Sequence, residues 1–275
     1  MGKHLASDSL CNVPLAKAVQ SASALLVEAE HVVALVGSGL SVDSGIPTFR
    51  GTEGIGSRLG APSSRGYKFF LENPGDWWKQ QVDRKADPAR TILRDAIDKA
   101  QPNAGHIALA KLEKMGILKL TVTQNVDGLH QKAGSSLVAE IHGNRAKLRC
   151  IGCESRWNNH DLGSIPYPPR CLQCEDLVKT DTVMFGEPVP PGTLSLCYRE
   201  ASRCDCIIAA GTSGTVFPAA NLPNRVVATG GSMIEANTAS TPLSSRAKVI
   251  LRGSTSHTLP MIVERVQQLT GISST

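Results

Sequence analysis

The chain has 275 residues, 41% of them hydrophobic, and a formal net charge of +5. This length and composition allow one large hydrophobic core with a smaller module and exclude a series of independent domains. The mild positive charge does not indicate a nucleic-acid-binding protein, because no basic run with interleaved aromatic residues is present. The sequence shows neither a signal peptide nor a segment able to span a membrane. We expect a globular protein of the cytoplasm, or of the nucleus in a eukaryote.

Apolar residues recur at helical spacing between residues 14 and 30, which predicts a helix with Asn12 as its cap. The apolar run 31–36 then predicts a buried strand that leads into Gly37, Ser38 and Gly39. After this turn, Ser41 and Ser44 stand where a helix could start. A diphosphate can lie against the backbone N–H groups of such a turn, because glycine has no Cβ to block its approach. Alone, the pattern is equally that of a glycine turn between a strand and a loop.

The middle of the chain predicts a loop at 51–66, rich in glycine, serine and proline, and helices at 67–81 and 89–99. Aromatic residues in the first of these helices indicate a packing module rather than a platform for stacked bases. A further helix begins near residue 102 and ends near Gly116. We expect His106, at its start, to be structural rather than catalytic.

Polar residues follow the next predicted strand, 118–123, at once: Gln124, Asn125 and Asp127. In open α/β sheets, ligands bind at the carboxyl ends of strands, although this pattern alone is also that of a capped helix start. Strands are predicted again at 207–210, 233–236 and 249–251, with a closing helix that ends near residue 269. Strands that alternate with helices predict an α/β fold, a Rossmann-like doubly wound parallel sheet.

Four of the eight cysteines form two C-x-x-C pairs, Cys150 with Cys153 and Cys171 with Cys174. Each pair can place two thiolates on one turn, and together they complete a tetrahedral zinc site without an open position. Neither pair lies at a strand-to-helix start, where a redox dithiol of the thioredoxin type would lie. The spacing therefore predicts one structural zinc ion.

Several blocks resemble the signatures of the sirtuins, the NAD-dependent protein-lysine deacylases. The block 34–51, ALVGSGLSVDSGIPTFRG, resembles the first signature, with Ser38 in place of the common alanine. The block 123–134, TQNVDGLHQKAG, reproduces the second almost letter for letter, and Gly211 to Ala220 resembles a third. The resemblance covers residues 32–269.

The resemblance implies a Rossmann-like NAD-binding domain made of residues 1–50, 101–145 and 188–275. It also implies a smaller domain formed by two insertions, 51–100 and 146–187, which carry the cofactor loop, a helical module and the zinc module. Within this arrangement, acyl-lysine peptide would add as a strand to the segment 183–188.

Site residues follow from the same resemblance. Asp127 would grip the nicotinamide carboxamide of NAD, Asn125 would orient the ribose and its water, and His142 would act as the general base. Phe49 would shield the pocket, and Arg50 would hold the diphosphate together with the glycine turn. The implied cofactor-binding residues are Gly37, Ser38, Gly39, Ser41, Ile46, Thr48, Phe49, Arg50, Gln124, Asn125, Val126, Asp127, His142, Gly211, Thr212, Ser213, Asn237 and Thr255. The implied substrate-binding residues are Val183, Phe185, Gly186, Glu187 and Val216.

The implied reaction transfers the acyl group of a lysine to the ADP-ribose part of NAD and releases nicotinamide. ADP-ribosylation of a protein acceptor and a non-catalytic module that binds NAD or acyl-peptide stay open as alternatives. Within the family, a desuccinylase or a long-chain deacylase also stays open. The desuccinylating branch uses a tyrosine and an arginine three residues apart, and Gln81 and Arg84 stand at the corresponding spacing. Because the tyrosine is missing, we expect an acetyl or another uncharged acyl group. The sequence does not determine the oligomeric state, and a monomer is compatible with it.

Overall fold

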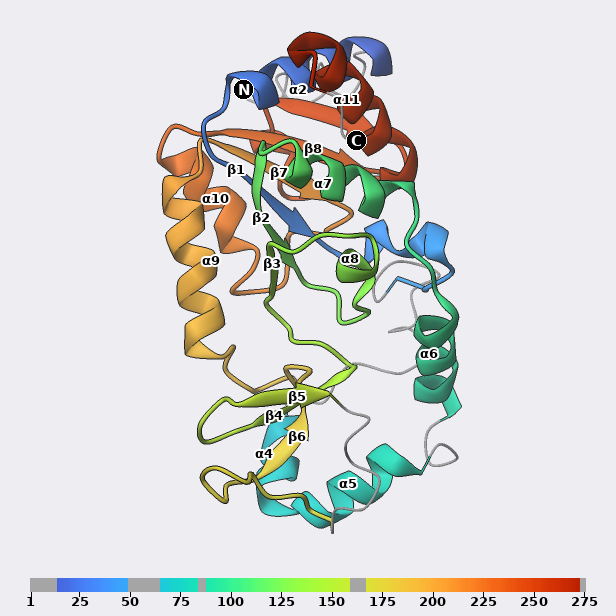
Figure 1. The fold of residues 1–275 in the computed structure, drawn as a ribbon, viewed down its shortest axis with the longest axis vertical. Helices are drawn as coiled ribbons and strands as arrows, with labels where there is room; N and C mark the ends of the chain where they lie inside the picture. The colour runs from blue at the N-terminus through green and yellow to red at the C-terminus, as the bar shows by residue number, and fades with distance from the viewer. Residues whose placement is uncertain (1–13, 49–64, 84–87, 159–166, 273–275) are drawn as a thin grey trace, which may run out of the picture.

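The computed structural model describes residues 14–48, 65–83, 88–158 and 167–272. Its centre is a parallel six-stranded sheet of order β3-β2-β1-β7-β8-β9 (Figure 1). The chain therefore fills one half of the sheet from β1 outward and then returns to β7 on the other side of β1. Such a reversal opens a crevice at the carboxyl ends of the strands, between β1 and β7. The strands are β1 Val32–Val36, β2 Leu118–Thr123, β3 Val138–Glu140, β7 Cys206–Ala210, β8 Ser232–Asn237 and β9 Val249–Arg252.

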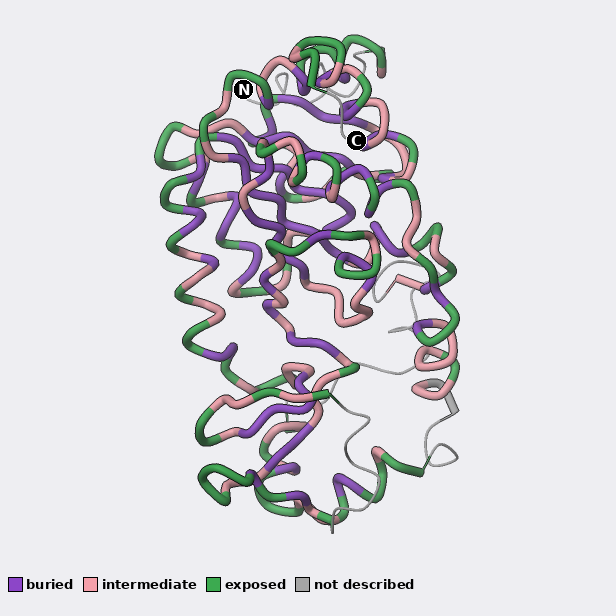
Figure 2. Tube along the Cα trace, in the orientation of Figure 1, coloured by how far each residue is buried: buried purple, intermediate pink, exposed green. Residues whose placement is uncertain are grey.

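Helices cover both faces of this sheet. On one face lie α2 (Leu15–Glu28), α7 (Ala104–Lys114) and α11 (Thr255–Thr270), and on the other lie α9 (Pro191–Arg203) and α10 (Asn221–Ala228). Side chains of a strand alternate between faces, so Ala34 packs with the first set and Leu35 with the second. All of β1 is buried, as Figure 2 shows along the central strands. The predicted doubly wound α/β fold is confirmed.

Two local predictions were wrong. The N-cap of α2 is Pro14, which makes no side-chain cap hydrogen bond, and Asn12 lies outside the described residues. After the glycine turn the chain forms two short 3-10 helices, η1 (Ser38–Leu40) and η2 (Val42–Ser44), instead of one helix. Gly45, with φ of 84°, ends η2 in the left-handed region. The closing helix α11 contains Pro260 and ends at Thr270, one residue beyond the predicted end near residue 269.

A second, three-stranded antiparallel sheet of order β5-β4-β6 lies at the other end of the molecule (Figure 1). Around it pack α4 and α5, whose aromatic residues form one buried cluster with Leu148 and Val178. The predicted aromatic packing module is therefore present. The elements of this part are α4 Gly66–Glu72, α5 Pro74–Val82, β4 Lys147–Cys150, β5 Arg156–Asn158 and β6 Val178–Thr180.

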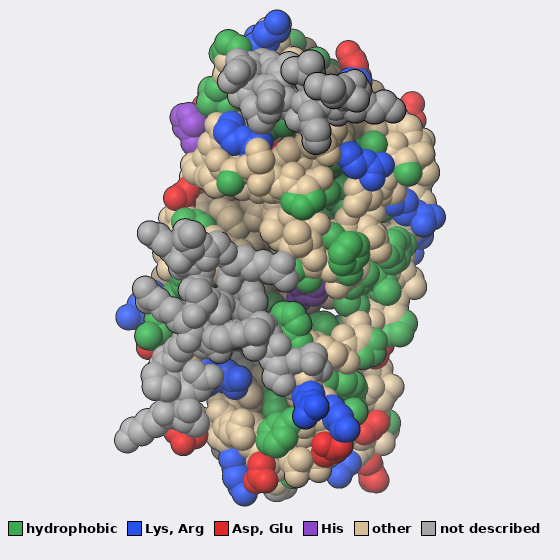
Figure 3. Space-filling model, turned by 180° about the vertical axis from the view of Figure 1, so that it is seen from behind, with side chains coloured by type: hydrophobic (Ala, Val, Ile, Leu, Met, Phe, Trp, Pro, Cys, Tyr) green, Lys and Arg blue, Asp and Glu red, His purple; other side chains and the backbone are tan. Residues whose placement is uncertain are grey.

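Two further helices share a small apolar cluster with Ile46. In α6 (Pro88–Lys99), Ile97 packs against Ile46 and against Leu129 of α8 (Leu129–Lys132). No helix in the described ranges is long and apolar enough to cross a membrane. On the face drawn in Figure 3, Lys and Arg side chains are interspersed with Asp and Glu at the lower end.

Candidate active site

The glycine turn after β1 packs directly against the turn after β7. A Cβ on Gly37 would lie 2.7 Å from the Gly211 carbonyl oxygen, and one on Gly39 would lie 2.8 Å from the same atom. The backbone N–H of Gly39 donates to that oxygen at 2.8 Å. Glycine is thus required at both positions, because two backbones meet at the point where the strand order reverses. This is the crevice expected to hold the diphosphate.

Asp127 and Asn125 are tied to the glycine turn across the sheet edge. The Ser41 hydroxyl donates to Asp127 Oδ2 at 2.7 Å, and the Leu129 N–H donates to Oδ1 at 3.0 Å. Asn125 Nδ2 donates to the Gly37 carbonyl and to Ser41 Oγ, both at 3.1 Å. A carboxylate accepts about four hydrogen bonds, so Asp127 keeps acceptor capacity for a bound amide. The structure therefore brings together residues from the first and second signatures.

His142 follows β3 and faces the same strand ends. Its Nδ1 lies 3.2 Å from the Gln124 carbonyl oxygen, an acceptor only, so Nδ1 carries the proton. Burial lowers the pKa of His142 below its ordinary 6.5, opposed by this hydrogen bond. The imidazole is therefore neutral at pH 7, and the Nε2 lone pair is the proton acceptor that a general base needs.

The remaining predicted cofactor residues lie at the neighbouring strand ends. Thr212 accepts two amide hydrogen bonds, from Gln124 Nε2 to its Oγ1 at 2.8 Å and from Asn237 Nδ2 to its carbonyl at 2.9 Å. Thr255 is buried and donates to the Gly39 carbonyl at 3.4 Å. Ile46 is buried, whereas Ser38, Thr48, Val126 and Ser213 are half-buried. Phe49 and Arg50 lie outside the described residues.

Asn103 is a site residue whose role the sequence analysis missed. Its Nδ2 donates to the Leu40 carbonyl at 2.7 Å and to Ser44 Oγ at 3.0 Å, and thereby holds both 3-10 helices. Its Oδ1 accepts from the Gly105 N–H at 2.9 Å, as an N-cap does. His106 Nδ1 completes the capping box by accepting from the Asn103 N–H at 3.3 Å. The structural role expected for His106 is thus confirmed, and the Pro-Asn start of the helix was the available signal.

Two buried histidines, His106 on α7 and His130 on α8, pack against each other near this region. The rings of His106 and His130 lie 5.1 Å apart, at 0% and 1% exposure. Burial is the main cause that lowers the pKa of each to about 4, and neither ring has a charged partner within hydrogen-bonding distance among the described residues. The fold therefore requires both side chains to be neutral.

Acid should weaken the fold through this pair. The histidines bind protons near pH 6.5 when unfolded but near pH 4 when folded, so their contribution is complete above pH 6.5 and is lost as the pH falls toward 4. Each should cost about 2 kcal/mol of unfolding free energy between pH 7 and pH 5. Urea unfolding of the parent and of His130→Leu at both pH values checks this. The variant should lose about 2 kcal/mol less than the parent, and equal losses would contradict the prediction.

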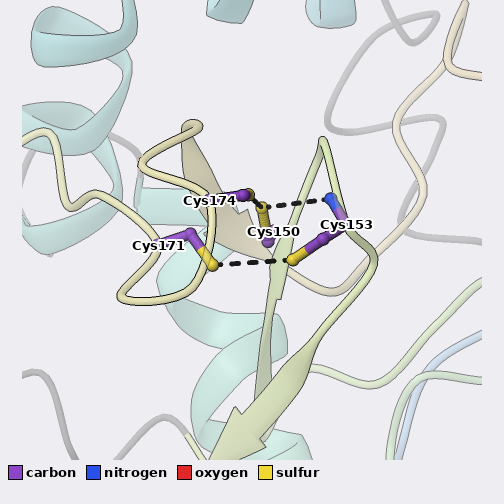
Figure 4. Close-up of side chains that lie close together, drawn as sticks. All are labelled: Cys150, Cys153, Cys171 and Cys174. Atoms are coloured by element: carbon purple, nitrogen blue, oxygen red, sulfur yellow. Dashed lines mark hydrogen bonds between the residues drawn. The ribbon is translucent and has the colours of Figure 1, made fainter.

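The four C-x-x-C cysteines converge on one point (Figure 4). Their Sγ atoms all lie within 4.8 Å of one another, with Cys150 to Cys174 at 3.4 Å and Cys153 to Cys171 at 3.6 Å. Four sulfurs bound to zinc at about 2.3 Å stand about 3.8 Å apart, whereas a disulfide requires about 2.05 Å. The donor set fits one tetrahedral zinc ion with every position filled, so the ion is structural.

The predicted substrate segment passes beside His142. The Val183 N–H donates to the His142 carbonyl at 2.9 Å, and Phe185 is 45% exposed. Phe185 also lines a groove of about 780 Å³ together with Gln81 and Met184. Val216, on the loop after β7, is half-buried, and its neighbour Phe217 is 66% exposed. The Glu187 carboxylate, in contrast, is buried in ion pairs with Arg149 and Lys179.

Comparison with known proteins assigns this chain to a protein family. The family model described as "Sir2 family" matches residues 37–218, which is more than half of the chain. The chain belongs to the Sir2 family. Its match includes both glycine turns, the Asn125 and Asp127 loop, His142 and all four zinc-site cysteines. The resemblance read from the sequence signatures is therefore confirmed.

Relatives of this Sir2 chain match nearly their whole length. NAD-dependent protein deacylase 1 of Archaeoglobus fulgidus is 39% identical over 243 residues, 88% of this chain and 96% of the relative. NAD-dependent protein deacylase of Thermococcus kodakarensis is 38% identical, over 90% of this chain and 95% of its own length. A solved Sir2 homologue mutant in complex with ADP-ribose is 37% identical, with a TM-score of 0.77 over 91% of this chain and 97% of that one. A Sir2 complex with p53 peptide and NAD+ is 33% identical, with a TM-score of 0.68 over 91% of this chain and 97% of that one.

Proposed function

We propose that this Sir2 chain is an NAD-dependent protein-lysine deacylase that moves an acyl group from lysine to ADP-ribose and releases nicotinamide. The observation that carries the proposal is the neutral His142, whose Nδ1 is fixed by the Gln124 carbonyl at 3.2 Å beside Asn125 and Asp127. The names of the relatives agree with it, since they are protein deacylases that depend on NAD.

Asp127, Asn125 and His142 have separate roles in the reaction. When bound, NAD supplies a ribose carbon that carries a good leaving group, nicotinamide. Asp127 accepts from the nicotinamide amide, and Asn125, held by the Gly37 carbonyl and Ser41, orients the ribose and a water molecule. His142 Nε2 would take a proton from a ribose hydroxyl, so that this oxygen could bond to the acyl carbon while the bond from that carbon to the lysine nitrogen breaks and lysine leaves as the free amine. The zinc ion, enclosed by four thiolates, takes no part in these steps.

Mass spectrometry of acetyl-, succinyl- and long-chain-acyl-lysine peptides, incubated with the protein with and without NAD, tests the proposal. We expect loss of the acyl group only when NAD is present, together with equimolar acyl-ADP-ribose. If labelled NAD instead transfers its ADP-ribose to protein without deacylation, the activity is that of an ADP-ribosyltransferase. Failure to deacylate any peptide by folded, zinc-loaded protein would contradict the proposal.

The proposed acyl group is acetyl or another uncharged chain. At the position of the tyrosine used by desuccinylating members stands Gln81, and Arg94 holds this residue through the Gln81 carbonyl at 2.9 Å and Oε1 at 3.0 Å. Gln81 Oε1 thus accepts from Arg94, and glutamine lacks the phenolic hydroxyl with which the tyrosine would donate to a succinyl carboxylate. Arg84 lies outside the described residues.

Replacing Gln81 by tyrosine should therefore change the acyl preference. A phenol that donates to a carboxylate makes a charge-assisted hydrogen bond, so the ratio of succinyl to acetyl turnover should rise by about tenfold. Gln80→Tyr is the matched control, because Gln80 lines the same groove one residue away. Competition between acetyl- and succinyl-lysine peptides measures the ratio. If the parent already prefers succinyl-lysine, the proposed acyl preference is wrong.

We further propose that the Rossmann-like domain (1–50, 101–145 and 188–275) binds NAD, and that the smaller domain (51–100 and 146–187) holds zinc and one side of the peptide site. A cytoplasmic location is proposed because two C-x-x-C pairs and four scattered cysteines suit a metal site in a reducing compartment better than a disulfide framework.

A further inference from the structure

A set of charged side chains is buried between the zinc-module sheet and the segment 182–187. We call it the buried ion cluster: Arg149 on β4, Lys179 on β6, and Asp181 and Glu187 beyond β6. Arg156 on β5, with its side chain 33% exposed, pairs with Asp181 at the edge of this cluster. The side chains of Arg149, Lys179, Asp181 and Glu187 are at most 5% exposed. Buried charges are costly, and ion pairs seldom stabilise a fold more than apolar residues of the same size. Their placement therefore calls for a reason other than stability.

Lys179 holds both ends of the segment 182–187. Its Nζ donates to the Thr180 and Thr182 carbonyls, both at 2.8 Å, and lies 3.1 Å from Glu187 Oε2. An ammonium group has three N–H donors, so each of them has a partner here. Lys179 thereby links Thr180 and Thr182, at the start of the segment, to Glu187 at its end.

Glu187 closes the segment into a turn. Its Oε2 also accepts from the Met184 N–H at 2.8 Å, and its own N–H donates to the Met184 carbonyl at 3.0 Å. Arg149 binds Glu187 Oε1 and donates from Nε to Asp181 Oδ1 at 2.9 Å. The buried ion cluster thus fixes the backbone that carries Val183 and Phe185.

The start of this segment and the preceding Asp181 pack tightly against His142 and Gly143. A Cβ on Gly143 would lie 1.9 Å from the Asp181 carbonyl oxygen, and Gly143 has φ of 77°, so only glycine fits. The Val183 N–H holds the His142 carbonyl at 2.9 Å. No contact of the buried ion cluster, in the ranges that the structure describes, reaches the Gly37, Thr212 or Asn237 side of the site.

We infer that Lys179, together with Arg149 and Glu187, positions the segment 182–187 for the acyl-lysine peptide and so sets peptide affinity without setting NAD affinity. The inference rests on the proposed deacylase function. These are positioning residues, because they act through the backbone of the segment and do not touch the reacting atoms. The Glu187 side chain then contributes to peptide binding from behind the segment rather than by contact with the peptide.

The test is Lys179→Met, which keeps the length of the side chain and removes its three donors. The KM for acetyl-lysine peptide should rise by about tenfold, whereas kcat at saturating peptide should stay within about threefold of the parent. The dissociation constant for ADP-ribose, measured by calorimetry, should be unchanged. Lys79→Met is the matched control, because Lys79 is an ion-paired lysine of the same part at 79% exposure. It should leave all three quantities at their parent values.

Zinc content and the melting temperature show whether Lys179→Met is folded. If it is not, Glu187→Gln, which keeps the size and weakens both ion pairs, should raise the KM for peptide in the same way. An unchanged KM, or a fall in kcat accompanied by weaker ADP-ribose binding, would overturn the inference. If the parent protein deacylates no peptide, the proposed function fails, and fluorescence anisotropy of a labelled acetyl-lysine peptide then tests the positioning role alone.

Discussion

The His142→Ala variant should lose NAD-dependent deacylation, with kcat lower by about 10²- to 10⁴-fold, the range that removal of a general base produces. Alanine cannot take the proton from the ribose hydroxyl, and the fully buried imidazoles of His106 and His130 are not accessible to replace it. NAD should still bind, since Asn125 and Asp127 are held by Ser41 and Gly37 rather than by His142. Single-turnover mass spectrometry with acetyl-lysine peptide measures the loss.

The pH dependence of the parent enzyme supplies an independent check on His142. Burial lowers the pKa of this imidazole below 6.5, so the acid limb of kcat/KM should lie below pH 6.5 and the rate should be level above it. His257→Ala is the matched control, because His257 is exposed at the start of α11. It should keep the parent rate and pH profile. Full activity of His142→Ala would show that His142 is not the general base.

Local sequence was enough to find the strand ends that carry the site. Glycine at 37 and 39, and the polar run from Gln124 to Asp127, each follow a short apolar stretch, and parallel strands bring their carboxyl ends to one edge. The partners of these residues were not predictable in the same way. Asn103 holds the Leu40 carbonyl across more than sixty positions of sequence, and no spacing rule connects the two.

The buried ion cluster shows where the sequence pattern misleads. In β6, Lys179 stands between Val178 and Thr180, the alternation typical of a strand with one solvated face. Lys179 is instead 0% exposed, because the segment 182–187 folds back over that face and supplies carbonyl and carboxylate partners. Similarly, the two 3-10 helices after β1 replace the predicted helix, because the Ile46 N–H donates to the Ser41 carbonyl and turns the chain away at Gly45. Tertiary contacts decide both cases.

Removing the zinc ion should unfold the small module and stop catalysis while leaving the parallel sheet folded. Structural zinc contributes about 10 kcal/mol or more to the folding of small zinc modules. Two of the four thiols, those of Cys150 and Cys171, are buried in the same cluster as Leu148, Val178 and Phe70. The core of the six-stranded sheet is formed by other residues, on both of its faces. Loss of the metal should therefore disorder the cluster that contains Cys150 and Cys171, and should leave the two clusters on the faces of the six-stranded sheet intact.

Tryptophan fluorescence can follow this change, because all three tryptophans of the chain, Trp77, Trp78 and Trp157, belong to the zinc-module cluster. Trp78 Nε1 donates to the Val178 carbonyl at 2.9 Å, which ties α5 to β6. Chelation, or the Cys171→Ala substitution, should shift the emission to longer wavelength and release one zinc ion per chain. Far-UV circular dichroism should retain most of the helical signal, since α2, α7, α9, α10 and α11 pack on the six-stranded sheet.

Activity should fall together with the fluorescence change, although the zinc ion touches no reacting atom. The strands β4 and β6 pair Cys150 with Val178 and Arg149 with Lys179, so the metal ligands and the buried ion cluster share one register. When these strands separate, Lys179 and Arg149 release Glu187, and the segment beside His142 is no longer held. Cys197→Ala is the matched control, because this buried thiol packs on the six-stranded sheet and should keep zinc, fluorescence and activity. Deacylation at the parent rate by zinc-free protein would contradict the prediction, because it would show that His142 keeps its position when the zinc module is unfolded.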